Sequence, residues 1–522
     1  MNYSIIFRKK YTFNDIIKYS KINGPTMFLL LWTIYQSYYY SKGFVIQQFF
    51  KLIRILTPIN NQINNFKKDM ANTFQQSPLT LYKIPNEGMN EKQIFNLINN
   101  LPKSKQDWKL GKISGTVYDG NNILSTLVNK VMTLYQWSNP LHPDLFPQIR
   151  QMEAEIVSFC LDLYKGKEDH CGTVTTGGTE SIILACKTYR DYYKDRKGIS
   201  NPEIIAPISV HVAFDKACHY LGIKLIKVKV NNNGIPLVSN IEKKINSQTI
   251  CIVGSAPSFP HGVIDPLEEM GKLALKYDVG LHMDACLGGF VLPFLENNKY
   301  NFNINGLSSI SLDTHKYGYG PKGGSVILYD RKELIHCQYH VVMDWPGGIY
   351  ISPSIPGSRS GAIIAGTWTS LLFNGKTGYK NKIKEIIELR DEIIDGLQDI
   401  PEIEIIGKPE TTIVAIKCSS IIPKNNIYSI HQHLTEKGWN LNSLQDPPAL
   451  HICLTSIHCQ QTEDLGKLFI SDINEALIFV RLNPNYEVTG MASIYGTTQS
   501  IPDKSIVKEL SRHYQDLYYK LN

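Results

Sequence analysis

Apolar runs alternate with helical patterns between about residue 111 and residue 381. Short apolar runs at 249–253, 279–283 and 325–328 are typical of buried strands, and residues 266–277 repeat with the period of an amphipathic helix. Alternation of strands and helices predicts a mostly parallel sheet with helices on both faces. We therefore expect a large α/β domain over residues 111–381.

The pattern changes after residue 381. A long charged helix is predicted over 382–397, a strand over 412–416 and a closing helix over 507–521. Residues 382–522 thus form a predicted smaller C-terminal α/β domain. Residues 58–110 are polar and contain several prolines, which predicts a connector or N-terminal arm.

The N-terminal 57 residues contain a different kind of segment. Twenty residues between Lys21 and Lys42 carry no charge, and twenty helical residues span about 30 Å, enough to cross a bilayer core. A signal peptide is one alternative, although no small-residue cleavage site follows, and a buried amphipathic helix is another. We expect a single transmembrane helix at about 22–41, and residues 1–57 as an anchor segment.

Composition narrows the class of protein and its compartment. The net charge of +7 is mild and dispersed along 522 residues, which argues against a nucleic-acid partner. The ten cysteines show no CxxC pair or zinc spacing, so we expect reduced thiols, no disulfide framework and no metal site. Basic residues around the uncharged span lean slightly towards a cytosolic N-terminus. The cysteines favour a cytosolic catalytic domain instead, and we give them more weight.

Three short motifs carry the candidate chemistry. Lys316 lies among glycines and aromatics, Asp284 ends a predicted buried strand, and a glycine turn containing Gly178 and Thr179 precedes a predicted helix. Each alone has an ordinary explanation, namely a surface lysine, a turn-capping aspartate and a tight turn. Together they supply what pyridoxal phosphate needs: an amine for a Schiff base, a carboxylate for the pyridine nitrogen and backbone N–H groups for the phosphate. His211 follows another strand and could stack on the ring, although a lone histidine is more often structural.

The order of these motifs and of others along residues 110–500 resembles one family. The chain is similar to the sphingosine-1-phosphate lyases, a membrane-anchored group within the group II pyridoxal-phosphate-dependent decarboxylases. Their fold is fold type I, like that of aspartate aminotransferase. The matching segments are Gly115-Thr-Val-Tyr118, Asn139-Pro-Leu-His-Pro-Asp-Leu-Phe-Pro147, Thr176-Gly-Gly-Thr-Glu-Ser181, Phe259-Pro-His-Gly-Val-Ile-Asp265, Met283-Asp-Ala-Cys-Leu-Gly-Gly-Phe290, Asp313-Thr-His-Lys-Tyr-Gly-Tyr319, Trp345-Pro-Gly-Gly-Ile-Tyr350, Gly357-Ser-Arg359, Lys437-Gly-Trp-Asn-Leu-Asn442 and Gly490-Met-Ala-Ser-Ile-Tyr-Gly496.

The resemblance implies a role for each candidate residue. It implies that Lys316 binds the cofactor, Asp284 pairs with the pyridine nitrogen and His211 stacks on the ring. The residues that it places near the cofactor phosphate are Gly178, Thr179, His315 and Ser358. The residues that it places towards the substrate are Tyr118, His142 and Lys322. Because sites of this fold lie at a dimer interface, Tyr118, His142 and Ser358 could serve the cofactor of the partner subunit in a homodimer.

The resemblance also implies the reaction and its setting. A phosphorylated sphingoid base would be cleaved between C2 and C3 in a retro-aldol step, giving a long-chain aldehyde and phosphoethanolamine. The general base stays open among Lys316, Lys322, Tyr350 and a phosphate oxygen. An amino-acid decarboxylase of the same fold is the alternative activity, and a non-catalytic membrane scaffold is a third. The implied location is the endoplasmic reticulum membrane, crossed once, with the catalytic domain in the cytosol.

Overall fold

A computed structural model describes residues 80–484, except 105, 425, 462 and 463, together with 486, 504–521 and a few positions between 63 and 74. The chain divides into two compact units, residues 1–107 with 488–522, and residues 108–487. In the first unit the described helices include α5 (Glu91–Asn99) and α18 (Lys504–Tyr518). The predicted domain boundaries at residues 57, 110 and 381 stay a prediction.

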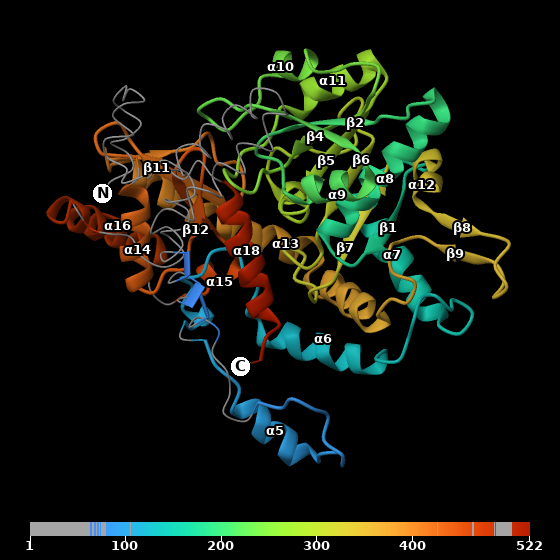
Figure 1. The fold of residues 1–522 in the computed structure, drawn as a ribbon, viewed down its shortest axis with the longest axis horizontal. Coiled ribbons are helices and arrows are strands. Elements are labelled where there is room, and N and C mark those ends of the chain that lie inside the picture. Colours follow the sequence, from blue (N-terminus) through green and yellow to red (C-terminus); the bar gives the residue numbers. More distant parts are fainter. Residues whose placement is uncertain are drawn as a thin grey trace, which may run out of the picture. The chain divides into compact units, whose positions relative to one another are not determined.

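A seven-stranded sheet forms the centre of the second unit (Figure 1). Its order is β1-β7-β6-β5-β4-β2-β3. The strands are β1 (Cys171–Thr175), β2 (Glu203–Pro207), β3 (Lys224–Val228), β4 (Thr249–Ser255), β5 (Gly280–Ala285), β6 (Ser309–Leu312) and β7 (Ser325–Tyr329). The predictions of strands at 249–253, 279–283 and 325–328 are confirmed within a residue or two.

The sheet is mixed, because β7 runs antiparallel to both of its neighbours whereas the pairs among β2 to β6 are parallel. The expectation of a mostly parallel sheet is therefore confirmed. A parallel strand after β6 would need a crossover that usually contains a helix, but the twelve residues between Leu312 and Ser325 contain none. The chain instead turns back along β6 after the loop that contains Lys316.

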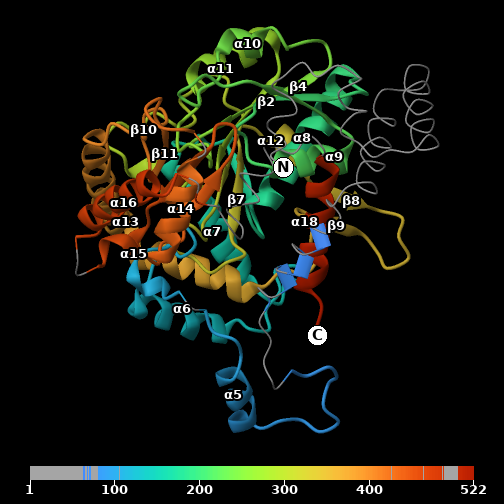
Figure 2. The same cartoon turned by 60° about the vertical axis from the view of Figure 1, so that its left-hand side comes forward.

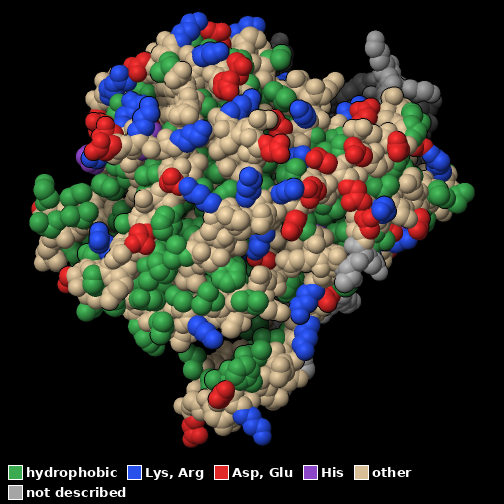
Figure 3. Space-filling view, turned by 180° about the vertical axis from the view of Figure 1, so that it is seen from behind, with side chains coloured by type: hydrophobic (Ala, Val, Ile, Leu, Met, Phe, Trp, Pro, Cys, Tyr) green, Lys and Arg blue, Asp and Glu red, His purple; other side chains and the backbone are tan. Residues whose placement is uncertain are grey.

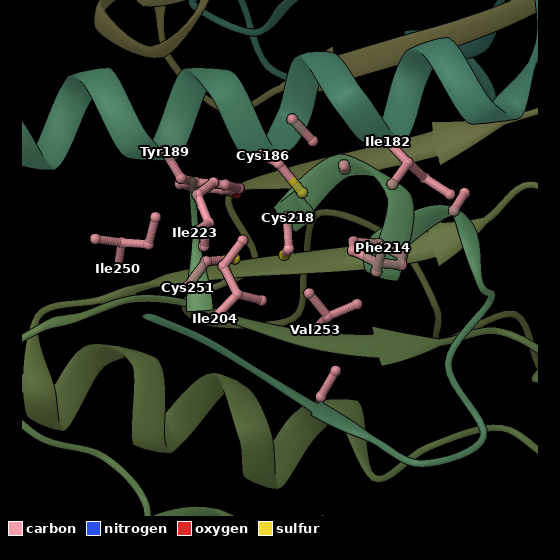
Figure 4. Packing of buried hydrophobic residues seen from close by; sticks show 14 of the residues in the cluster. Ile182, Cys186, Tyr189, Ile204, Phe214, Cys218, Ile223, Ile250, Cys251 and Val253 are labelled. Atoms are coloured by element: carbon pink, nitrogen blue, oxygen red, sulfur yellow. The ribbon is translucent and has the colours of Figure 1, made fainter. Parts of the chain in front are cut away.

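Helices cover both faces of this sheet. Helix α8 (Gly178–Lys197) packs on one face with α9 (Ala213–Leu221) and α12 (Lys332–Gln338) against it. On the opposite face, α7 (Pro147–Leu163) packs against β1 and β7, and α11 (Leu267–Tyr277) against β4 and β5. In Figure 4, Ile182, Cys186 and Tyr189 point from α8 towards the strands, where Cys251 and Val253 of β4 meet them. Burial of this apolar layer fixes the position of α8 over the sheet.

A second, antiparallel sheet follows along the chain. Its order is β10 (Ile403–Ile405), β11 (Ile413–Cys418), β13 (Ala449–Cys453) and β12 (Asn442–Leu444). Two helices, α14 (Asn426–Glu436) and α16 (Leu465–Leu482), pack on each other, and α14 also contacts β11 and β13. The predicted strand at 412–416 is confirmed as β11, and the predicted closing helix overlaps α18.

One long helix, α13 (Gly361–Gln398), differs from the prediction of a helix over 382–397. It begins 21 residues earlier and contains a non-helical residue, Gly375, with φ of 55°. Its first half packs along α6 (Asn122–Leu134), as Figures 1 and 2 both show. Residues such as Ala365 and Thr369 are buried there, so the first half lacks the polar stripe that marks an amphipathic helix in a sequence.

The predicted membrane span at about 22–41 lies outside the described residues. Among the residues that the structure describes, none of the helices is both long and apolar enough to cross a membrane.

Candidate active site

The glycine turn between β1 and α8 forms an open cradle. Gly177 has a φ of +152°, and a Cβ on Gly178 would lie 2.7 Å from Oδ1 of Asp313. A side chain therefore cannot be accommodated at Gly178, and the first turn of α8 exposes its backbone N–H groups. These groups and the positive end of the helix dipole favour an anion such as a phosphate.

Glu180, in the first turn of α8, fixes this cradle to a neighbouring loop. Its Oε2 accepts hydrogen bonds of 2.6 Å from the backbone N–H and the hydroxyl of Thr176. Its Oε1 accepts one of 2.8 Å from the backbone N–H of Ile355. Because Glu180, Thr176 and Ile355 all line the cavity, these hydrogen bonds hold this part of its wall together.

Asp284 lies near the carboxyl end of β5, on the face of the sheet that α8 covers. The residue is 6% exposed and lines the cavity, and its Oδ1 accepts a hydrogen bond of 3.0 Å from the backbone N–H of Cys286. A carboxylate held in this way can bind a protonated pyridine nitrogen.

Lys316 lies on the loop after β6 and projects into the same cavity. Its Nζ is 2.9 Å from Oδ2 of Asp313, a side chain that is 3% exposed. Burial is the largest single influence and lowers the pKa of the Lys316 amine, but the charge and hydrogen bond of the Asp313 carboxylate, with smaller contributions from Cys286 and Tyr118, together raise that pKa above its usual value. Sequence reasoning missed Asp313. Its position three residues before Lys316 was the only available signal.

His211 and His315 border the cavity on two sides. The Nδ1 of His211 accepts a hydrogen bond of 3.2 Å from the backbone N–H of Ala213, which holds the ring after β2. The Nδ1 of His315 lies 2.5 Å from the carbonyl oxygen of Gly324, and burial lowers the pKa of this imidazole. His315 is therefore a neutral group close to the glycine cradle.

Tyr118 and Lys322 meet beside Lys316. The Nζ of Lys322 lies 4.7 Å from the centroid of the Tyr118 ring and donates a hydrogen bond of 3.3 Å to the carbonyl oxygen of His315. Burial raises the pKa of the Tyr118 hydroxyl, so it stays a neutral donor. Desolvation and the neighbouring Lys316 lower the pKa of Lys322. The two lysines are thus shifted in opposite directions.

Two predicted site residues, His142 and Ser358, are exposed and do not line this cavity. Both belong to the same surface region, because Asn139, in the turn that contains His142, donates a hydrogen bond of 3.1 Å to the hydroxyl of Ser358. The structure therefore brings seven of the predicted residues to the wall of one cavity, with Lys322 beside them. These seven are Tyr118, Gly178, Thr179, His211, Asp284, His315 and Lys316. The predicted segment Gly490–Gly496 lies outside the described residues.

The dimensions and chemistry of this cavity fit pyridoxal phosphate. Its volume is about 620 Å³, within the usual range for cofactor sites. The glycine cradle would hold the phosphate, Asp284 the ring nitrogen and Lys316 the aldehyde carbon. Each of these three groups of the cofactor thus has a suitable counterpart on the wall.

Comparison with known proteins gives one consistent result. Residues 75–419 match the model of the pyridoxal-dependent decarboxylase conserved domain. The chain is 40% identical to sphingosine-1-phosphate lyase 1 of Mus musculus over 486 residues, which cover 91% of this chain and 84% of that protein. The solved sphingosine-1-phosphate lyase of Burkholderia pseudomallei is 31% identical, has a TM-score of 0.75 and matches 85% of this chain and 98% of its own. A glutamate decarboxylase of Lactobacillus brevis, at 19% identity and a TM-score of 0.67 over 80% of this chain and 98% of its own, shares the fold alone.

Proposed function

The chain belongs to the sphingosine-1-phosphate lyase family of pyridoxal-phosphate-dependent enzymes, and we propose how its own residues carry out the cleavage. It is a carbon–carbon lyase that acts on phosphorylated sphingoid bases and releases a long-chain aldehyde and phosphoethanolamine. The observation that supports our assignment of residues is the convergence of Lys316, Asp284 and the N-terminus of α8 on one cavity.

When bound in this cavity, pyridoxal phosphate supplies an aldehyde that captures an amine and a ring that withdraws electrons from the bond that breaks. Asp284 keeps the ring nitrogen protonated, because a buried carboxylate next to that nitrogen favours its charged form. His211 would pack on the ring, and the first turn of α8 would hold the phosphate. Lys316 would hold the cofactor through its amine.

Lys316 and Lys322 have different roles in the cleavage. Lys322 has a lowered pKa, so its neutral form is more accessible than that of Lys316, and we propose that it takes the proton of the substrate's C3 hydroxyl. Tyr118 is neutral and donates a hydrogen bond to an oxygen of the substrate. Lys322→Arg keeps the positive charge but not the ability to accept a proton. We expect a fall in kcat of about 100-fold with KM within threefold of wild type, and the reverse pattern would assign Lys322 to binding instead.

The direct test of the activity is a product assay. Purified protein, pyridoxal phosphate and a sphingoid base phosphate should give aldehyde and phosphoethanolamine in equal amounts. Lys316→Ala should give neither product and should lack the visible absorbance of the bound cofactor while keeping the far-UV circular dichroism of the wild type. Carbon dioxide release from amino acids, without aldehyde, would instead favour the alternative decarboxylase.

A homodimer would complete the site. His142 and Ser358 lie outside the cavity of their own chain, which supports a role for them in the site of a second copy. Apolar side chains gather over α6 and over the hairpin of β8 (His340–Val342) and β9 (Tyr350–Ser352), as Figure 3 shows. Exposed residues in these two regions and just after α6 are Ile123 (72%), Leu134 (79%), Trp137 (91%), Trp345 (56%) and Ile349 (70%). An exposed apolar surface of this kind is typical of a subunit interface.

The uncharged segment at 22–41 supports attachment to a membrane, which suits a substrate with a long alkyl chain. All ten cysteines of the chain are free thiols, which supports a catalytic domain in the reducing cytosol and, by family likeness, on the endoplasmic reticulum. Deletion of residues 1–57 should move the activity from the membrane fraction to the supernatant. Retention of the shortened protein in the membrane fraction would assign the attachment to another region.

A further inference from the structure

A row of buried polar side chains connects helix α8 to Asp284 through strands β5 and β6. The hydroxyl of Tyr189 lies 2.5 Å from Oγ of Ser309, which lies 2.8 Å from Nδ1 of His282. On the other side of the imidazole, Nε2 lies 3.1 Å from Oγ of Ser311. The Ser311 hydroxyl lies 3.5 Å from Oδ1 of Asp284. The row therefore ends on the carboxylate assigned to the cofactor ring.

The register of the sheet creates this row. Strands β5 and β6 are parallel, and His282 pairs with Ser309 while Asp284 pairs with Ser311. Side chains two residues apart lie on the same face of a strand, so all four project towards α8. Tyr189 points from α8 to the strands, as Figure 4 shows. The imidazole is 1% exposed and both serine side chains are fully buried, so their hydrogen bonds have no competition from water.

The carboxylate determines the direction of these hydrogen bonds. An ionised Asp284 can only accept, so Ser311 donates its hydroxyl proton to it and must itself accept from Nε2–H of His282. The imidazole is neutral, because burial lowers the pKa of His282 to about 4. With its proton on Nε2, its Nδ1 accepts from Ser309. The ring therefore acts as a fixed, uncharged link.

We propose that His282 is a positioning residue for pyridoxal phosphate, which holds the Asp284 carboxylate at the ring nitrogen through Ser311 and joins it to α8 through Ser309 and Tyr189. The inference rests on the proposed role of Asp284. Helix α8 also provides the phosphate cradle at its N-terminus. One buried network would thus fix the distance between the two groups that hold opposite ends of the cofactor.

A purely structural role for His282 makes a different prediction. A histidine that only fills the core would affect the stability of the protein without the cofactor, and any polar or apolar residue of similar size would be tolerated by the cofactor site. A positioning role requires a donor at the place of Nε2. Glutamine offers an amide N–H near that place, whereas asparagine offers one near Nδ1, and leucine offers none.

The experiment compares His282→Gln, His282→Asn and His282→Leu in the full-length protein. Cofactor-free protein is titrated with pyridoxal phosphate, its visible absorbance gives Kd, and thermal unfolding of the cofactor-free form is measured separately. We expect Kd to rise about tenfold in the Leu and Asn variants and to stay within about threefold in Gln, since loss of an outer hydrogen-bond partner at metal ligands costs roughly 10–100-fold. Thr188→Val is the matched control, because Thr188 is buried next to Tyr189 on α8 but contacts Tyr329 instead.

Several outcomes would overturn the proposal. One is a wild-type Kd in the Leu variant together with a lower Tm, and another is rescue by Asn but not by Gln. If the Leu variant fails to fold, Ser311→Ala removes a single hydroxyl from the same row and should also raise Kd about tenfold. An unchanged Kd in Ser311→Ala would contradict the proposed role of this hydrogen-bonded row. Asp284→Asn in the same titration separates the two claims, because a normal Kd and spectrum in that variant would also refute the assignment of Asp284.

Discussion

The Lys316–Asp313 pair determines the protonation state of the Lys316 amine when pyridoxal phosphate enters the cavity. An amine attacks an aldehyde only when neutral, and Asp313, 2.9 Å away, stabilises the ammonium form. Oδ1 of Asp313 has no hydrogen-bond partner among the described residues and lies 2.7 Å from the position that a Cβ on Gly178 would take. The carboxylate therefore faces the glycine cradle with one unpaired oxygen. Its negative charge also opposes the binding of a phosphate anion.

Asp313→Asn should make cofactor loading faster at neutral pH. Without the carboxylate, the pKa of Lys316 falls, the neutral amine is present at lower pH, and the pH at which loading is half-maximal moves down. The measurement is the rate of visible absorbance gain when pyridoxal phosphate is added to cofactor-free protein between pH 6 and 10. Asp215→Asn, which removes a surface partner of Lys227, is the control. Slower loading with an unchanged pH profile would show that Asp313 only orients the lysine.

The sequence predicts those site residues that stand in short local motifs. Lys316, Asp284 and Gly178 stand in short motifs whose residue types match the cofactor, so they could be predicted. The role of His282 depends on which strand lies beside β5 and on the register of that strand, which pairs residues 27 positions apart. No local pattern specifies that pairing, and a buried histidine or an aspartate in a loop has ordinary explanations.

Helix α8 has a glycine that serves function at its first residue and a glycine that serves stability just after its last residue. Gly178 begins the helix without room for a Cβ, since that atom would lie 2.7 Å from Asp313 Oδ1 and 2.8 Å from Cys286 Sγ. Gly198 ends it with a φ of +67° and no atom within 4 Å of a Cβ. The first glycine is required by neighbouring atoms, the second by its backbone conformation alone.

Substitution of the two glycines by alanine should therefore separate two effects. In Gly178→Ala the affinity for pyridoxal phosphate should fall by roughly 5- to 150-fold, the equivalent of about 1–3 kcal/mol of overpacking. In Gly198→Ala the free energy of unfolding should fall by about 1–2 kcal/mol with unchanged affinity. Denaturant unfolding and cofactor titration of both variants check this, and equal losses of affinity would argue against a cradle at Gly178.

Element predictions were right for short strands that are buried along their whole length, and incomplete for a long helix whose first half is buried on several sides. Strands β4, β5 and β7 could be predicted, because short apolar runs between turn residues are distinctive. The reversal of β7 could not, because a buried strand reads the same in either direction. The first half of α13 was missed for a related reason. Helix α6 and other elements of the second unit cover it on several sides, so its sequence has no polar stripe.

Each cavity of the whole molecule could be completed by side chains of its own chain or of a second copy. Tyr118 lines the cavity of its own chain, where its ring contacts Tyr317 at a centroid distance of 5.0 Å. His142 and Ser358 are exposed on a surface that one chain leaves uncovered. Sequence motifs list these residues together without assigning them to a subunit, so a symmetric dimer could share them across its two-fold axis.

Mixing two inactive variants assigns His142 to a subunit. If His142 serves the partner's cavity, a hybrid dimer of Lys316→Ala and His142→Ala chains contains one cavity with both residues intact. Random exchange of equal amounts makes about half of the dimers hybrids, so about a quarter of wild-type specific activity should return. A mixture of Lys316→Ala with Asp284→Ala should stay inactive, because both residues line the same chain's cavity. If His142 acts in its own chain, the first mixture also stays inactive, since every cavity then lacks one of the two side chains.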